Sequence, residues 1–266
     1  MTRAQKVLLA LLVLSIFLNY IDRSNLSLAA PIMQREYGLS TADIGWLSSA
    51  FFWTYALLQL FGIAGWFADR YPPGLVLAGG LFIWSAATVL TGVLSGIPAL
   101  FATRLLVGAG ESVAYPCYSR IFAAAIPAER RGIANAFLDA ASKLGPALGT
   151  LAGGALLATV GWRMFFVVLG VLSLLWLIPW FKFARIDAEQ TAATADAPSI
   201  PQILSQRSAW GAFLGHFCGN YFWFFLLTWL PTYLVNERGF PMQRMVNVTT
   251  IAYLAIAAAT MCAGWI

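Results

Sequence analysis

The sequence predicts an all-α membrane protein that crosses the bilayer many times. Of its 266 residues, 60% are hydrophobic and 10% are charged, whereas soluble domains carry about 25% charged residues. A bilayer span takes about 20 helical residues, and apolar runs of that length recur along nearly the whole chain. Composition and run length therefore indicate helices in lipid.

Breaks at glycine, proline and charge clusters divide the chain into eight expected spans. The first competes with a cleaved signal peptide, because "MTRAQK" is basic and the apolar stretch 7–18 is short. Asp22, Arg23 and Asn25, followed by renewed apolar residues, favour a functional span instead. The eight spans cover residues 7–33, 42–66, 75–97, 98–124, 132–159, 164–184, 208–235 and 245–266.

The basic residues predict the topology. With a cytoplasmic N-terminus, nine of the 16 Lys and Arg residues lie in cytoplasmic segments, and four lie in outer loops: Arg35, Arg163, Arg238 and Arg244. This bias predicts a multi-pass protein of the cell inner (plasma) membrane with its N-terminus in the cytoplasm. The net charge of +5 is spread over short loops, so no nucleic-acid partner is expected.

Cysteine and histidine usage predicts no metal site. The three cysteines are far apart, and the single histidine, His216, stands on the seventh span. No metal, disulfide framework or cofactor is therefore expected. We expect His216 to be hydrogen-bonded by a neighbouring helix.

A change of composition divides the chain into two parts. The polar stretch "IDAEQTAATADAPSIPQ" differs from everything before it and reads as a cytoplasmic linker. The expected domains are a six-helix bundle over 1–185, a linker over 186–206 and a partial second bundle over 207–266. "GWFADR" begins 34 residues after Pro31, and "GWI" begins 33 residues after Pro231. This spacing predicts two parallel repeats.

Several motifs carry a family resemblance. "GWFADRYPPG" after the second span, "PAERRG" after the fourth and "GWRMFF" after the fifth resemble loops of the major facilitator superfamily. "NYIDRSNLSLAAP", "RLLVGAGESVAYP" and "LLTWLPTYL" resemble its anion:cation symporter branch, which includes bacterial transporters for galactonate, glucarate and hexuronates. The resemblance implies twelve helices in two bundles. This chain supplies the complete six-helix N-terminal half and two helices of the C-terminal half, so we expect a truncated chain or a fragment.

Charged residues inside two spans form two polar stripes. Asn19, Asp22 and Arg23, with Tyr20 nearby, lie on one helix face; a second face carries Arg104, Gly108, Glu111 and Tyr115. Charge at the bilayer centre costs about 2.5–3.5 kcal/mol on insertion scales, so these residues are functional candidates. We expect both stripes to face one cavity. The structural alternative is that Asp22 pairs with Arg104, and Glu111 with Arg23, merely to hold helices together.

The fifth span carries a further charged pair and a run of small residues. The i, i+4 spacing of Asp139 and Lys143 allows them to pair, either as structural neutralisation or with Lys143 as a second cation for the substrate. Gly145, Gly149 and Gly153 are spaced by four residues, which favours close helix packing.

The resemblance adds roles to these residues. It implies proton-carrying roles for Asp22 and Glu111, a substrate-binding tyrosine at Tyr55, and a cytoplasmic gate contact between bundles at Asp69 and Arg70. The expected site therefore has four groups: Tyr20, Arg23, Tyr55 and Asn220 for substrate; Asp22 and Glu111 for protons; Arg104, Asp139 and Lys143 as supporting ion pairs; Gly65, Asp69 and Arg70 at the gate.

These residues predict a proton-coupled symporter for small organic anions, such as hexonates, aldarates or hexuronates, that is a monomer when full length. The planar guanidinium of Arg23 suits a carboxylate, and a buried acid that loses its cation partner takes up a proton more readily. The sequence contains no HExxH, catalytic Ser/His or phosphate-loop motif, which argues against an enzyme. The remaining alternatives are a non-transporting fragment, an accessory membrane subunit, or uptake of another carboxylate such as an aromatic acid.

Overall fold

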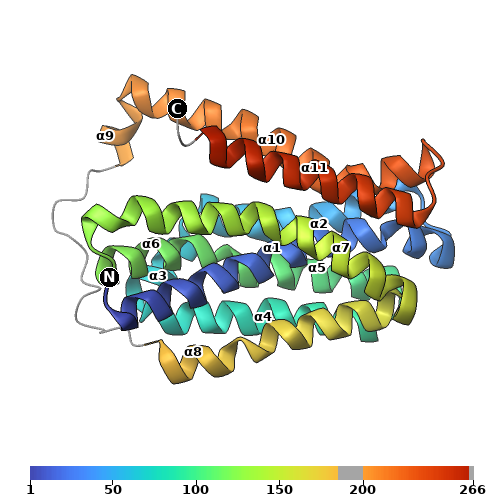
Figure 1. The fold of residues 1–266 in the computed structure, drawn as a ribbon, viewed down its shortest axis with the longest axis horizontal. Coiled ribbons are helices and arrows are strands. Elements are labelled where there is room, and N and C mark those ends of the chain that lie inside the picture. The colour runs from blue at the N-terminus through green and yellow to red at the C-terminus, as the bar shows by residue number, and fades with distance from the viewer. Residues whose placement is uncertain (185–199, 264–266) are drawn as a thin grey trace.

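The computed structural model describes residues 1–184 and 200–263, and every regular element among them is a helix. The helices lie side by side along the long axis of the molecule (Figure 1). Their bounds are α1 Arg3–Tyr37, α2 Thr41–Leu60, α3 Ile63–Arg70, α4 Pro73–Val93, α5 Ile97–Ser112, α6 Ala114–Ala125, α7 Ala128–Leu175, α8 Leu177–Phe183, α9 Ile200–Leu204, α10 Arg207–Asn236 and α11 Met242–Ala263.

Each of the eight expected spans corresponds to a long helical segment. The second span comprises α2 and α3, which are bent by 60° where Gly62 adopts a left-handed φ of 68°. The fourth comprises α5 and α6. The element α7 contains the fifth span and most of the sixth. Between these two spans the chain reverses at Gly161, whose φ of 75° and ψ of 169° suit a residue without Cβ. Figure 1 shows α7 reaching one end of the molecule and turning back toward α8.

By length and composition, four of the described helical segments can cross a membrane, or five if α2 and α3 form one bent span. One of the four, Ala128–Phe183, has 56 residues and includes the reversal at Gly161. Neither α10 nor α11 is among them. In α10, Asn220, Pro231 and several Trp and Tyr residues lower the mean hydropathy.

The glycines of α7 pack against α1, as their spacing predicts. A Cβ at Gly145 would lie 2.7 Å from the carbonyl oxygen of Phe17, and one at Gly149 would lie 2.9 Å from Cγ1 of Ile21. Only residues without side chains allow the two helices to approach so closely. This contact fixes the position of α1 along α7, and α1 carries the first polar stripe.

The described parts of the expected domains are arranged as follows. Helices α1 to α8 form one bundle, and α10 and α11 lie along it (Figure 1). Most of the expected linker, residues 186–199, lies outside the described residues, and the short helix α9 follows it. The N-terminus and the described end of α11 lie at the same end of the molecule.

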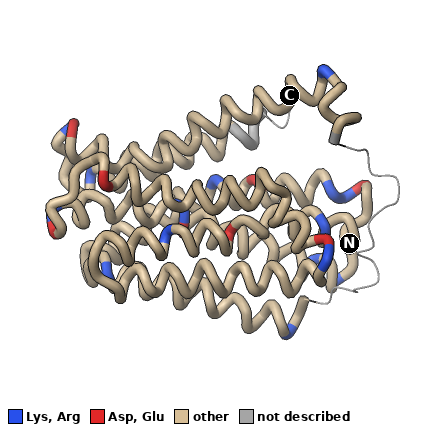
Figure 2. Tube along the Cα trace, turned by 180° about the vertical axis from the view of Figure 1, so that it is seen from behind, with Lys and Arg blue, Asp and Glu red and all other residues tan. Residues whose placement is uncertain are grey.

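Charged residues gather at the two ends of the long axis. Figure 2 shows blue and red segments at both ends and a mostly uncharged middle, with a few charged residues inside it. This pattern is typical of helices that span a bilayer. The few interior charges define the candidate site.

Candidate functional site

An ion pair joins α1 to α5 in the interior. The Nε of Arg23 lies 2.7 Å from Oε2 of Glu111, with 3% of the Arg23 side chain and none of the Glu111 side chain exposed. Nη2 of Arg23 and Oε1 of Glu111 have no hydrogen-bond partner. Buried polar atoms are usually satisfied, so this pair retains a free donor and a free acceptor.

Four aromatic rings surround the Arg23 guanidinium. Its carbon lies 4.8 Å from the ring centre of Tyr55, 4.9 Å from Tyr20, 5.3 Å from Phe51 and 5.8 Å from Phe224. Aromatic faces attract cations, and their bulk excludes water. The rings therefore hold a permanent charge in an apolar surrounding, while Nη2 of the guanidinium has no partner.

The second acid, Asp22, is held by neutral groups. It is 2% exposed, and its Oδ1 accepts hydrogen bonds from Nδ2 of Asn25 at 2.9 Å and Oγ1 of Thr88 at 3.2 Å. Its Oδ2 has no partner. Arg104 is 4% exposed, and its guanidinium lies 6.0 Å from the ring of Phe166.

The two proposed structural pairings have different outcomes. Glu111 pairs with Arg23, whereas no ion pair within 4.0 Å joins Asp22 and Arg104 among the described residues. Asp22 and Arg104 therefore form no contact ion pair, although the two charges still interact at longer range. Thr88 of α4, not a cation, occupies hydrogen-bonding distance of Asp22, and Nε of Arg104 has no partner.

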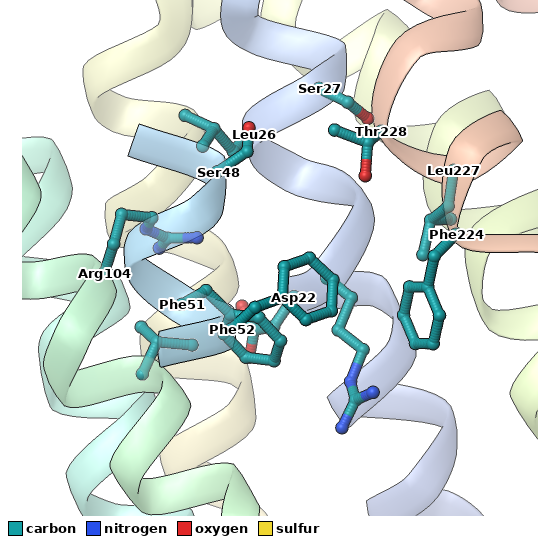
Figure 3. A pocket seen from close by; sticks show the side chains of 12 residues that line it. Asp22, Leu26, Ser27, Ser48, Phe51, Phe52, Arg104, Phe224, Leu227 and Thr228 are labelled. Atoms are coloured by element: carbon teal, nitrogen blue, oxygen red, sulfur yellow. The ribbon is translucent and has the colours of Figure 1, made fainter. Parts of the chain in front are cut away.

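Residues of both polar stripes line one pocket, but Glu111 is not among them. Asp22 of α1 and Arg104 of α5 line it (Figure 3), and so does Arg23 of α1. Its free volume is about 30 Å³, which is enough for a water molecule or two but not for a six-carbon acid. The remaining lining residues come from α1, α2, α5 and α10: Leu26, Ser27, Ser48, Phe51, Phe52, Val107, Phe224, Leu227 and Thr228.

Tyr20 and Tyr55 contact Arg23, but Asn220 lies elsewhere. The hydroxyl of Tyr20 is 3.0 Å from that of Tyr115. Asn220 lines a groove of about 510 Å³ between α2 and α10. Nδ2 of Asn220 lies 2.7 Å from Nε2 of His216, so the partner of His216 is on its own helix and not, as expected, on a neighbouring one.

The pairing of Asp139 with Lys143 that the spacing allows is not a contact ion pair. Among the described residues no ion pair joins them; Asp139 is exposed. The Nζ of Lys143 instead lies 4.7 Å from the ring centre of Trp223 on α10. A spacing of four residues permits contact, but a ring on a neighbouring helix competes for the same ammonium. Neither residue lines the charged pocket.

The expected gate residues contact their own bundle. Asp69 of α3 forms an ion pair with Arg120 of α6, and no ion pair involves Arg70 among the described residues. A Cβ at Gly65 would meet no atom within 4 Å. Asp69 thus makes an ion pair within the first bundle, where α3 packs beside α6, and the expected gate contact between bundles stays a prediction.

Sequence reasoning missed several residues of the site. Thr88 of α4 and the rings of Phe51, Phe52 and Phe224 all contact the charged groups or line their pocket. Aromatic residues are frequent in this chain, 19 of them Phe, so nothing in the pattern distinguishes these three. Asn25 carried a usable signal, because it stands one helical turn beyond Asp22.

Residues 12–266 match the family model described as "Major Facilitator Superfamily". The chain belongs to this superfamily. Among curated relatives, a protein described as "Probable sulfoacetate transporter SauU" from Cupriavidus necator is 33% identical over 95% of this chain and 62% of its own length. The "Probable galactarate/D-glucarate transporter GarP" of Escherichia coli is 32% identical over 89% of this chain and 60% of its own length.

Two further comparisons agree with this membership. The "D-galactonate transporter" of E. coli O6:H1 is 28% identical over 99% of the chain and 67% of its own length. The inward-facing, unoccupied crystal structure of a bacterial homologue of the human lysosomal transporter Spinster matches with a TM-score of 0.79 at 21% identity, over 100% of this chain and 63% of that one. The chain spans 62% of the length of the sulfoacetate-transporter relative and 60% of the length of the galactarate/D-glucarate-transporter relative. Its fold is that of an all-α membrane protein of the major facilitator type.

Proposed function

We propose that this chain carries the anion-binding and proton-coupling site of a symporter that takes up organic anions of the sugar-acid class. The protein would lie in the cell inner membrane with its N-terminus in the cytoplasm, as a monomer when full length. The names of three relatives support an organic anion as substrate, because sulfoacetate, galactonate and galactarate are all organic acids. The observation that carries the proposal is the half-satisfied Arg23–Glu111 pair.

In this proposal, substrate and Glu111 compete for Arg23. Glu111 occupies Nε, while Nη2 on the same edge of the guanidinium is free. A substrate carboxylate that takes both nitrogens forms the bidentate pair that Arg favours. Binding of substrate thus displaces Glu111 from its cation.

The displaced acid supplies the coupling. A buried carboxylate without a cation partner takes up a proton more readily, so anion binding favours protonation of Glu111. By linkage, the proton strengthens anion binding by the same factor. The two ligands then move together.

Asp22 is a second proton carrier in this proposal. Its Oδ2 is buried without a partner beside the same pocket. One proton with a monoanion moves no net charge. A second proton adds one net positive charge, which gains about 2.3 kcal/mol per 100 mV of membrane potential.

The test is uptake into vesicles by the complete gene product carrying Glu111→Gln. We expect a pH gradient no longer to drive galactonate accumulation, while exchange of bound for free galactonate persists, because Arg23 still holds the anion. Asp139→Asn is the matched control, since Asp139 is exposed and outside the pocket. Undiminished accumulation by Glu111→Gln would remove Glu111 from the proton path, and absence of any organic-acid uptake by the unaltered protein would refute the substrate class.

A further inference from the structure

The charged pocket shares a wall with a much larger space. The groove between α2 and α10 has a volume of about 510 Å³, against about 30 Å³ for the charged pocket. Four residues line both: Ser48 and Phe52 of α2, and Phe224 and Thr228 of α10. These side chains therefore separate the buried charges from the space that is large enough for a ligand.

Two phenylalanine rings dominate that wall. The ring centres of Phe52 and Phe224 lie 5.3 Å apart, and the ring planes meet at 88°. Phe224 also lies 5.8 Å from the Arg23 guanidinium. Figure 3 shows both rings among the pocket's lining residues, with Phe224 extending from α10. An edge-to-face contact is a favourable arrangement for two aromatic rings.

The two volumes differ too much for a sugar acid to bind in the charged pocket as it stands. A sugar acid fits the groove but not the charged pocket, whose free space holds only a water molecule or two. Ser48 and Thr228 also line both spaces, but their side chains are much smaller than the rings. Of the four shared residues, Phe52 and Phe224 are therefore the largest obstacle to a carboxylate that moves from the groove to Arg23.

We propose that Phe52 and Phe224 form an aromatic gate that sets the substrate class, admitting slender acyclic acids to Arg23 and rejecting acids that carry an aromatic ring. This inference rests on the proposed organic-anion function. The gate spans α2 of the first bundle and α10 beyond the linker, so a small change in their separation opens it. The two rings then select substrates by the width of the acid, whereas Arg23 selects them only by their negative charge.

The first test measures substrate choice. Phenylacetate and glycolate are added as competitors of radiolabelled galactonate uptake by the complete gene product carrying Phe224→Ala. We expect inhibition by phenylacetate to strengthen by about tenfold or more relative to inhibition by glycolate, which is the scale on which pocket shape discriminates. Phe225→Ala is the matched control, because Phe225 lines the groove but not the charged pocket.

The second test needs no transport, so it distinguishes failure of the gate from failure of the proposed function. In a cysteine-free protein, Ser27→Cys places a thiol in the charged pocket, where Ser27 is 5% exposed. We expect an anionic methanethiosulfonate reagent to label it faster when Phe224→Ala or the milder Phe224→Leu is added, but not when Phe225→Ala is added. Equal labelling rates in all variants, or an unchanged ratio of phenylacetate to glycolate inhibition, would overturn the gate.

Discussion

Two ion pairs formed by the fourth span lie in very different surroundings. Arg23–Glu111 lies in the interior, where 3% and 0% of the side chains are exposed, while Arg120–Asp69 lies near one end with 26% and 56% exposed. Water solvates the second pair, so it is worth about 0–1 kcal/mol. The charges of Arg23 and Glu111 have lost their hydration, so each is stabilised by the other, and the neighbouring rings also stabilise Arg23.

This difference in exposure distinguishes an ion pair that only joins two helices from one that can respond to a ligand. A surface pair can form and break with little consequence, because water replaces either partner. In a buried pair, removing one partner leaves the other uncompensated. In the proposed mechanism, that penalty is what lets a competing anion at Arg23 change the protonation of Glu111, whereas the exposed Asp69 carries no such penalty.

The largest expected effect comes from breaking the buried pair. Arg23→Met leaves Glu111 buried without its cation and should lower the free energy of unfolding by about 3–5 kcal/mol. Thermal unfolding of the detergent-solubilised chain, followed by tryptophan fluorescence, measures it. The double variant Arg23→Met with Glu111→Leu should recover most of the loss, because apolar replacement of both partners is often neutral. Equal shifts from Arg23→Met and Arg120→Met would contradict the comparison.

A smaller effect is expected when the positive charge at position 23 is kept but the planar guanidinium is replaced by an ammonium group. Arg23→Lys removes the bidentate edge, so galactonate uptake by the complete gene product should fall about tenfold to a hundredfold, the value of one hydrogen bond to a charged group. Membrane insertion should be unchanged. Arg120→Lys is the matched control and should retain uptake within about twofold. Wild-type uptake by Arg23→Lys would exclude Arg23 as the substrate clamp.

The smallest effect concerns the surface pair itself. Asp69→Asn should change the free energy of unfolding by less than about 1 kcal/mol, and even this difference should shrink in 1 M salt, where screening acts over about 3 Å. The same thermal measurement at low and high salt tests it. A large, salt-independent loss would mean that Asp69 makes a buried contact that the exposed pair does not explain.

The sequence by itself determined the fold class, the family and the two polar stripes. Run length identifies helices in lipid, and the period of 3.6 residues assigns each side chain to a face. The loop motifs pointed to the major facilitator superfamily, which the family match confirms over residues 12–266. The glycine spacing of α7 likewise predicted a close contact, and α1 makes it.

Only the tertiary structure decided which partners the charged residues have. Periodicity fixes the face of a helix but not which neighbour lies opposite, nor how far each helix is shifted along its axis. Thr88 therefore replaced Arg104 as the partner of Asp22, and Trp223 replaced Asp139 as the partner of Lys143. Phe224 lies about 200 residues from Arg23 in sequence, and no local pattern links them, because packing between distant helices sets that contact.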